Sequence, residues 1–323
     1  MRAVNDRPAA APATTASPRP GALYTARPAD YLTLVLLALI WGSSFLFIEL
    51  GLRSLTPITL TASRITLGAI VLVSAARIMG HKIPRDAWHW RHFFLLGLFG
   101  HVLPFSLIST GQVHIDSGLA AVLIATVPLL TLPLAHVFTD DKINARKLIG
   151  VLLGFAGIVL LIGPEALAGL SGHFWGQLMI VGAALCFSIA MVIARRIRDV
   201  PSLVASAASV VCSTVMIVTL AFIVETPLAL QPAMISILGI LPLGVFSTGL
   251  AMLLYFRLNA TAGPNFVAAN NYIAPAIGVT LGVVLLGEPF TWRAVAAFVV
   301  ILAGIVIATV RLPARRSTPA PGE

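Results

Sequence analysis

The run Ala156-Gly157-Ile158-Val159 occurs a second time, unchanged, as Ala303-Gly304-Ile305-Val306. Laying the second copy over the first without a gap brings three more pairs of like residues into step: Pro128 with Pro275, Asp141 with Glu288, and Arg146 with Arg293. Agreement over so long a stretch indicates that one structural unit occurs twice in this chain.

Both copies lie in strongly apolar sequence. Of the 323 residues, 58% are hydrophobic and 10% are charged, with a mean hydropathy of +0.97, whereas roughly a quarter of the residues in soluble domains are charged. A water-soluble fold of this size cannot hide so much apolar surface, but lipid allows helices that are apolar on every side. We therefore predict an all-α integral membrane protein whose surroundings are a lipid bilayer.

Ten apolar runs have about the length of 17 to 25 residues that a transmembrane helix needs. They lie near residues 31–52, 58–78, 92–112, 117–138, 148–163, 174–194, 202–224, 233–256, 265–286 and 292–311. Each repeat then contributes five helices, and because five is odd, the second repeat enters the membrane with the opposite polarity to the first. The predicted fold is two inverted five-helix repeats around a central cavity.

The positions of the basic residues test this count, because cytoplasmic loops are enriched in Lys and Arg. With ten helices and the N-terminus inside, cytoplasmic segments hold 18 of the 21 Lys and Arg residues, whereas the outer loops hold only Arg53 and Arg293. We therefore expect both termini in the cytoplasm. The net charge of +9 follows from these loops and does not indicate a nucleic-acid partner.

The predicted organisation divides the chain into five parts. They are a disordered cytoplasmic tail over 1–30, a first repeat over 31–163, an outer linker over 164–173, a second repeat over 174–311, and a cytoplasmic tail over 312–323.

Several short motifs, in order and largely in duplicate, give the chain a family resemblance. They are Trp41-Gly42-Ser43-Ser44-Phe45, Arg64 in the second apolar run, the repeat-related Pro128 and Pro275, the turn Gly287-Glu288, and the closing run Ala303-Gly304-Ile305-Val306. Over residues 31–311 the sequence resembles the EamA-type transporters of the drug/metabolite transporter superfamily. It departs from that pattern at Asp140-Asp141, where these proteins usually have Gly-Glu, although the turn keeps an acidic residue.

This resemblance implies a ten-helix fold with a central cavity in a bacterial inner membrane. It also implies that the substrates are amino acids, other small metabolites or toxic organic compounds, and that transport is often export.

Polar and aromatic side chains at helical spacing inside the apolar runs form the candidate substrate site. They are Trp41 and Ser44 in the first run, His101, Ser109 and Gln112 in the third, Thr248 and Tyr255 in the eighth, and Asn270 and Asn271 in the ninth. Inside a bilayer such groups either line a cavity or hydrogen-bond neighbouring helices, and the spacing leaves both roles open. For the two asparagines, we expect Asn271 to share a helix face with Pro275 and two glycines.

Charged groups inside the membrane are costly and therefore informative. Glu49 and Arg64 lie at similar predicted depths in adjacent helices, which allows them to bridge, either as part of ion coupling or simply to pair the two helices. In the alternative, Arg64 snorkels to the outer interface. Glu288 precedes the last apolar run, where an acidic residue offsets the unpaired amides of a helix N-terminus.

The absence of other motifs narrows the function. The sequence has no phosphate-binding GxxxxGK[ST] loop, no HExxH motif and no GxSxG turn, so we expect no ATP, no cofactor, no metal and no enzyme chemistry. A secondary transporter that moves small polar or amphiphilic metabolites by alternating access ranks first. A membrane enzyme acting on a lipid-phase substrate ranks second and a scaffold third, and the sequence leaves monomer and homodimer open.

Overall fold

The computed structural model describes residues 26–138, 143–162, 172–197 and 199–309, and within these ranges the secondary structure is entirely helical. The predicted C-terminal tail, most of the predicted N-terminal tail and linker, and the pair Asp140-Asp141 lie outside the described residues. Helix α1 begins at Pro28, three residues inside the predicted tail. The Asp30 carboxylate accepts a hydrogen bond from the Arg27 amide at 2.8 Å, and this polar start of the helix precedes the apolar run.

The elements follow the predicted apolar runs along the chain. In the first half they are α1 (Pro28–Gly42), α2 (Ser44–Leu52), α3 (Pro57–Ile78), α4 (Ala87–Gly97), η1 (Leu98–Val102), α5 (Leu103–Gly111), α6 (Ser117–Ile124), α7 (Val127–Phe138) and α8 (Ala145–Ile162). In the second half they are α10 (Gly172–Ala194), α11 (Ser202–Val224), η2 (Pro227–Ala229), α12 (Met234–Leu241), η3 (Pro242–Leu250), α13 (Ala251–Thr261), α14 (Pro264–Val267), α15 (Asn270–Leu281), η4 (Gly282–Leu286) and α16 (Trp292–Thr309).

Seven helical stretches in the described residues are long and apolar enough to cross a membrane, and the stretches Asn270–Leu286 and Trp292–Ile307 are shorter. Two of the seven extend furthest beyond the predicted runs. The stretch Ala87–Gly111, predicted to begin near residue 92, begins where the Asp86 side chain caps the helix by accepting from the His89 amide. The stretch Met234–Thr261 was expected to end near residue 256. Apolar runs stop at charged residues, but the helical backbone continues past them.

Several of these stretches change helix type along their length. The segments η1, η3 and η4 are π-helical, and η3 begins at Pro242, whose ring removes a backbone donor. Turns of this kind often lie at functional sites. The first stretch is also interrupted, at Ser43 between α1 and α2.

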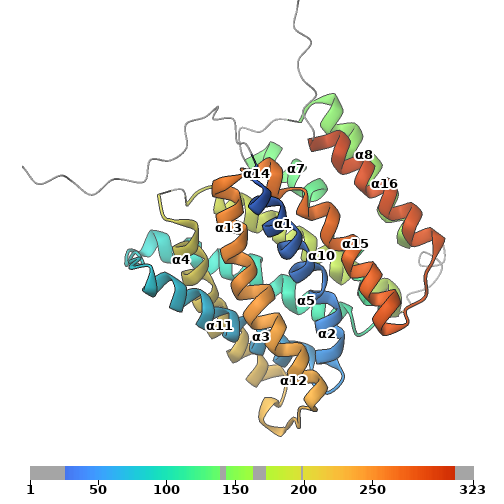
Figure 1. The fold of residues 1–323 in the computed structure, drawn as a ribbon. Coiled ribbons are helices and arrows are strands. Elements are labelled where there is room, and N and C mark those ends of the chain that lie inside the picture. Colours follow the sequence, from blue (N-terminus) through green and yellow to red (C-terminus); the bar gives the residue numbers. More distant parts are fainter. Residues whose placement is uncertain (1–25, 139–142, 163–171, 198, 310–323) are drawn as a thin grey trace, which may run out of the picture.

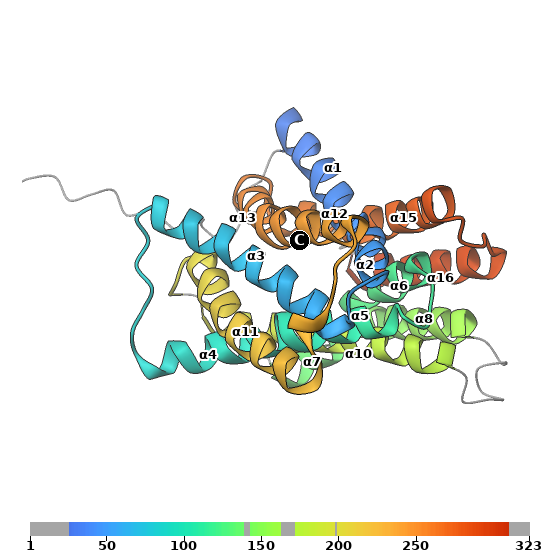
Figure 2. The same cartoon turned by 90° about the horizontal axis from the view of Figure 1, so that it is seen from below.

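Helices α8 and α16 form a closely packed pair along one side of the molecule (Figures 1 and 2). A Cβ atom added to Gly157 would stand 2.7 Å from the Ile301 side chain, and one added to Gly304 would stand 2.8 Å from the Gly154 amide nitrogen. The later residue of α8, Gly157, contacts the earlier residue of α16, Ile301, and the earlier residue Gly154 contacts the later residue Gly304. The two helices therefore run antiparallel. Only glycine allows the backbones to approach this closely.

Two other helix pairs make similar close contacts. Helix α1 packs against α15, because a Cβ atom on Gly42 would lie 2.6 Å from the Ala274 carbonyl oxygen. Helix α10 packs against α7, where the Ser188 hydroxyl donates to the Val127 carbonyl at 3.0 Å. In the repeat, Val127 is the position that corresponds to Ala274. Large apolar side chains such as Ile223 and Leu152 point outward, as expected for surfaces that face lipid.

Two carboxylates from the second half cap helices of the first half. Glu225 accepts hydrogen bonds from the Ile58 amide at 3.1 Å and the Thr59 amide at 2.7 Å, and also from the hydroxyls of Thr56 and Thr59. These amides open α3 and have no partner within the helix. Burial alone raises the pKa of the Glu225 carboxyl, but these hydrogen bonds outweigh it and hold the pKa below its ordinary value.

Glu288 caps a different helix from the one that the sequence suggested. Its carboxylate accepts from the amides of Ser117 at 2.8 Å and Gly118 at 2.9 Å, which open α6 rather than the following helix α16. The prediction was wrong because it considered only neighbours along the chain, whereas the α6 terminus is brought to Glu288 by packing.

The close packing of α8 and α16 predicts a sharp effect of one added methyl group. Gly304→Ala should lower the free energy of unfolding by about 1–3 kcal/mol, the usual cost of overpacking, because its Cβ would lie 2.6 Å from the Gly150 carbonyl oxygen. Thermal unfolding of the detergent-solubilised protein measures this. Gly182→Ala is the matched control, since its Cβ would meet Leu107 at an ordinary 3.6 Å. Equal melting temperatures for the two variants would contradict the packing.

The Glu225 cap predicts a pH-dependent contribution to stability. Glu225→Gln should cost about 1 kcal/mol at neutral pH. Because the folded-state pKa is depressed, the contribution is fully present above the ordinary glutamate value of about 4.3 and is lost as the pH falls through the folded-state pKa. Melting temperatures of wild type and variant should therefore converge on acidification. A difference that stays constant down to that range would show that the charge of Glu225 has no part in the cap.

Candidate functional site

A buried polar cluster lies where helices of the two halves meet. We call Arg64, His101, Phe105, Ser213 and Thr248 the central polar cluster. The Arg64 side chain is only 5% exposed. Its Nε donates to the Thr248 hydroxyl at 2.9 Å, and its Cζ lies 3.8 Å from the centroid of the Phe105 ring. The guanidinium is thus held by a hydroxyl and an aromatic face rather than by a carboxylate.

The π-helical turn of η3 places Thr248 against Arg64. The Thr248 hydroxyl donates to the Leu243 carbonyl five residues earlier, at 3.0 Å, and so keeps a lone pair directed at the guanidinium. Small residues let the two elements meet, since a Cβ atom on Gly68 of α3 would lie 2.4 Å from the Thr248 methyl group. Local helix geometry and close packing together fix this contact.

The predicted site residues of the third apolar run, His101, Ser109 and Gln112, lie inside the molecule. His101 Nδ1 is 3.4 Å from the Ser213 hydroxyl of α11, and Ser109 is 3.1 Å from the Thr61 hydroxyl of α3. Gln112 donates to the Phe45 carbonyl at 3.0 Å, while its Oε1 is buried without a hydrogen-bond donor. These three side chains therefore hydrogen-bond to three different helices, and the Gln112 Oε1 acceptor still has no donor.

The predicted residues of the first and eighth runs meet each other. The Trp41 Nε1 donates to the Ser247 carbonyl at 3.0 Å, and the Trp41 and Tyr255 rings lie 5.7 Å apart. The Ser44 hydroxyl, at the start of α2, donates to the Trp41 carbonyl of α1 across the interruption at Ser43. The Trp41 contacts join α1 to η3 and α13. Thr248 of the central polar cluster also belongs to η3.

The two asparagines of the ninth run face different surroundings. Asn270 is 3% exposed, and its Oδ1 has no hydrogen-bond donor, whereas Asn271 is exposed. Asn271 is four residues before Pro275 and so lies on the same face of α15. Pro275 and Gly278 on this face are buried, but Asn271 lies in the first turn of the helix, where the face is exposed. The structure therefore brings Asn270 into the interior and leaves Asn271 outside it.

The predicted bridge between Arg64 and Glu49 is wrong. Arg64 turns toward α5 and η3, whereas Glu49 is half-buried among the charges of Arg53, Asp116 and Glu288. Among the described residues, His89 forms ion pairs with Asp86 and Asp199, and neither pair includes Arg64 or Glu49. The position along each helix predicts that two residues lie at the same depth in the membrane. Whether their side chains meet depends on which face of its helix each residue occupies.

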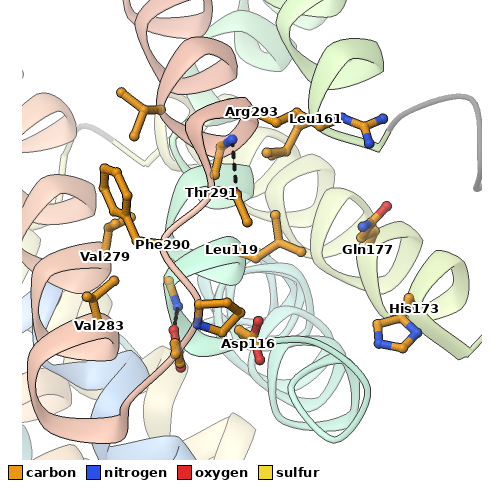
Figure 3. A pocket seen from close by; sticks show the side chains of 15 residues that line it. Asp116, Leu119, Leu161, His173, Gln177, Val279, Val283, Phe290, Thr291 and Arg293 are labelled. Atoms are coloured by element: carbon orange, nitrogen blue, oxygen red, sulfur yellow. Dashed lines mark hydrogen bonds between the residues drawn. The ribbon is translucent and has the colours of Figure 1, made fainter.

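A hollow of about 500 Å³ opens at the end of the molecule where α6 and α16 begin. Figure 3 shows Asp116, His173, Gln177 and Arg293 around it. It lies apart from the central polar cluster, and none of its residues belongs to the predicted site. One indirect signal is present in the sequence, because several of these polar residues flank the connections that the predicted topology places outside.

The described residues hold no group of three His, Cys, Asp or Glu side chains that could bind a metal ion. The arrangement is instead a bundle of apolar helices around a buried cation and several hydrogen-bonding side chains. Together these features define a multi-pass membrane protein with an internal polar site.

Comparison of the sequence with known protein families identifies the class of membrane protein. The profile of the EamA-like transporter family matches residues 29–163 and again residues 174–310. The chain therefore belongs to the EamA-like transporter family. The predicted resemblance is confirmed, and the chain is a transporter rather than an enzyme.

Individual relatives are similar over most of their length. The uncharacterized inner membrane transporter YedA of Escherichia coli (strain K12) is 28% identical over 276 residues, which are 84% of this chain and 88% of the relative. The uncharacterized transporter YoaV of Bacillus subtilis (strain 168) is 22% identical over 286 residues, 88% of this chain and 98% of the relative. A solved structure described only as "Crystal structure of protein" has a TM-score of 0.65 and 22% identity over 88% of this chain and 99% of that chain, so the fold is shared.

The contact between Arg64 and Thr248 predicts a site-specific loss of stability. Thr248→Val removes the acceptor of a buried charged donor and should cost about 1–3 kcal/mol, seen as a lower melting temperature. Thr280→Val is the matched control, because the Thr280 hydroxyl is exposed and bonds only within its own helix. If both variants melt together, the hydrogen bond to Arg64 does not contribute to stability.

Proposed function

We propose that this chain is a secondary transporter that exports small polar or amphiphilic metabolites, such as amino acids or related compounds, across the inner membrane by alternating access. One observation carries the substrate class. In the described part of the chain, the side chain of Arg64 has one hydrogen-bond acceptor, the Thr248 hydroxyl, and no carboxylate. A planar guanidinium binds carboxylates with two parallel hydrogen bonds, so a substrate carboxylate would complete the central polar cluster.

The placement of this cluster supports alternating access. Arg64 and Phe105 belong to the first half of the chain, and Ser213 and Thr248 belong to the second. When one half of an inverted-repeat transporter rocks against the other, a site built from both halves changes its shape and its access.

The contacts between α8 and α16 support the inverted arrangement of the two repeats. Gly157 packs on Ile301, and Gly304 packs on Gly154. In the repeat, Gly304 corresponds to Gly157 and Ile301 corresponds to Gly154. Such an exchange of equivalent contacts is what a two-fold axis between two copies produces.

On this basis we assign ten membrane-spanning helices, in repeats over 31–163 and 174–311. The excess of Lys and Arg in alternate loops supports cytoplasmic termini, and the name of the relative YedA supports an inner-membrane location.

The test is transport by the purified protein in liposomes. Labelled phenylalanine, its methyl ester and phenylethylamine differ at the carboxylate, and we expect saturable flux of phenylalanine only. Arg64→Gln should reduce this flux at least tenfold, and Arg64→Lys should reduce it less, because lysine keeps the charge but not the planar donor pair. An imposed pH gradient then tests proton coupling.

Arg53→Gln is the control, since Arg53 is an exposed arginine at the end of α2. Each variant is first checked for a wild-type melting profile. Unchanged phenylalanine flux through a folded Arg64→Gln protein would exclude the proposed carboxylate site.

A further inference from the structure

A narrow groove lies between helices α4, α7 and α10, and we call it the α4–α7–α10 groove. Its volume is about 190 Å³. Two of its lining side chains, His92 and Arg196, are polar, and the other six are apolar: Leu95, Leu134, Phe138, Ile189, Val192 and Ile193. None of these residues belongs to the central polar cluster, so the groove needs a ligand argument of its own.

The two polar side chains lie at the same end of the groove. The start of α4 is beside the end of α10, because the His89 ring is 2.9 Å from the Asp199 carboxylate. His92 is in the second turn of α4, and Arg196 is two residues past the end of α10. The groove therefore has a polar, basic end where these helices meet.

Away from this end the groove is apolar. Ile189 lies about 8 Å inside the end of α10 at the usual helical rise, and Leu95 lies one turn further along α4 than His92. Phe138 of α7 forms part of the wall and is 58% exposed, so the groove opens at the surface of the bundle. A ligand that fits has a polar head at one end and a hydrocarbon part at the other.

Exposed tryptophans mark the basic end as the level of the lipid headgroups. Trp88 is 43% exposed and Trp90 is 38% exposed, and tryptophan is enriched where the membrane meets water. The Trp88 ring lies 4.1 Å from the His92 ring, and His92 Nδ1 donates to the Trp88 carbonyl at 2.8 Å. The marker and the wall of the groove are thus one packed unit.

The acidic side chains described at this end do not neutralise Arg196. Asp86 and Asp199 both pair with His89, at 2.6 Å and 2.9 Å, whereas Arg196 is exposed. A guanidinium binds a phosphate group with two parallel hydrogen bonds. Basic pockets between membrane helices bind anionic headgroups in the same way.

We propose that the α4–α7–α10 groove binds one anionic phospholipid, with its phosphate on the Arg196 guanidinium and an acyl chain along Leu95, Leu134 and Ile189. The lipid then joins helices of both halves of the chain, since α4 and α7 belong to the first half and α10 to the second. The topology proposed above places this lipid in the cytoplasmic leaflet.

Native mass spectrometry of the full-length protein in detergent tests this proposal, because it resolves each bound lipid and gives its Kd. The probes are phosphatidylglycerol and phosphatidylcholine with identical acyl chains, which differ in the net charge of the headgroup. We expect one phosphatidylglycerol to bind at least tenfold more tightly than phosphatidylcholine. Equal affinity for the two lipids would overturn the proposal.

Variants locate the lipid. Arg196→Gln should raise the Kd for phosphatidylglycerol at least tenfold, and Leu134→Trp, which fills the groove, should weaken the binding of both lipids. Arg257→Gln is the matched control, because Arg257 is an exposed arginine of α13 outside the groove, and it should leave the Kd unchanged. Arg64→Gln should also leave it unchanged, so failure of the transport proposal and failure of this one are distinguishable.

The variants also give the results that would contradict the proposal. Wild-type affinity for phosphatidylglycerol in Arg196→Gln would overturn it, whether or not Leu134→Trp folds. An equal loss in Arg257→Gln would show that the lipid responds only to the net charge of the protein. Wild-type affinity in a folded Leu134→Trp protein would exclude the acyl chain from this groove.

Discussion

Close approach of helix backbones holds this molecule together, because lipid is as apolar as the side chains and offers no hydrophobic force between helices. The contacts of Gly157 and Gly304 show what this requires, since each position faces the partner helix at a distance where a methyl group would collide. The same need explains Gly42 against the Ala274 carbonyl. Where backbones come this near, the sequence has glycine, and the remaining helices are arranged around these crossings.

The buried arginine imposes the second constraint. Bringing a guanidinium into a helix bundle without a carboxylate is costly unless other groups satisfy it. Here a π-helical turn directs the Thr248 hydroxyl at Arg64, and Phe105 lends its ring face. Two of the three π-helical segments thus carry residues of the central polar cluster, His101 in η1 and Thr248 in η3, whereas η4 lies outside it.

Much of this fold is readable from the sequence, and the limits have physical causes. Apolar runs place the helices because the membrane fixes their length and composition, and the repeated motifs identify the family. Depth along a helix did not give the partner of Arg64, because the rotation of each helix decides which side chains meet. For the same reason Asn271 is exposed beside a buried neighbour. The cap that Glu288 makes on α6 and the hollow near Asp116 join segments far apart in the chain, so no local pattern announces them.

The two carboxylate caps make the ends of the molecule unequal. Glu225 and Glu288, both from the second half, hold four backbone amides of the first half at one end. Among the described residues, the opposite end is joined through side-chain pairs, an exposed one of His89 with Asp199 and a partly buried one of Thr261 with Asp30. If the halves move apart, the described side-chain pairs at that end separate at lower cost, whereas the glutamate end keeps its bonds to the backbone.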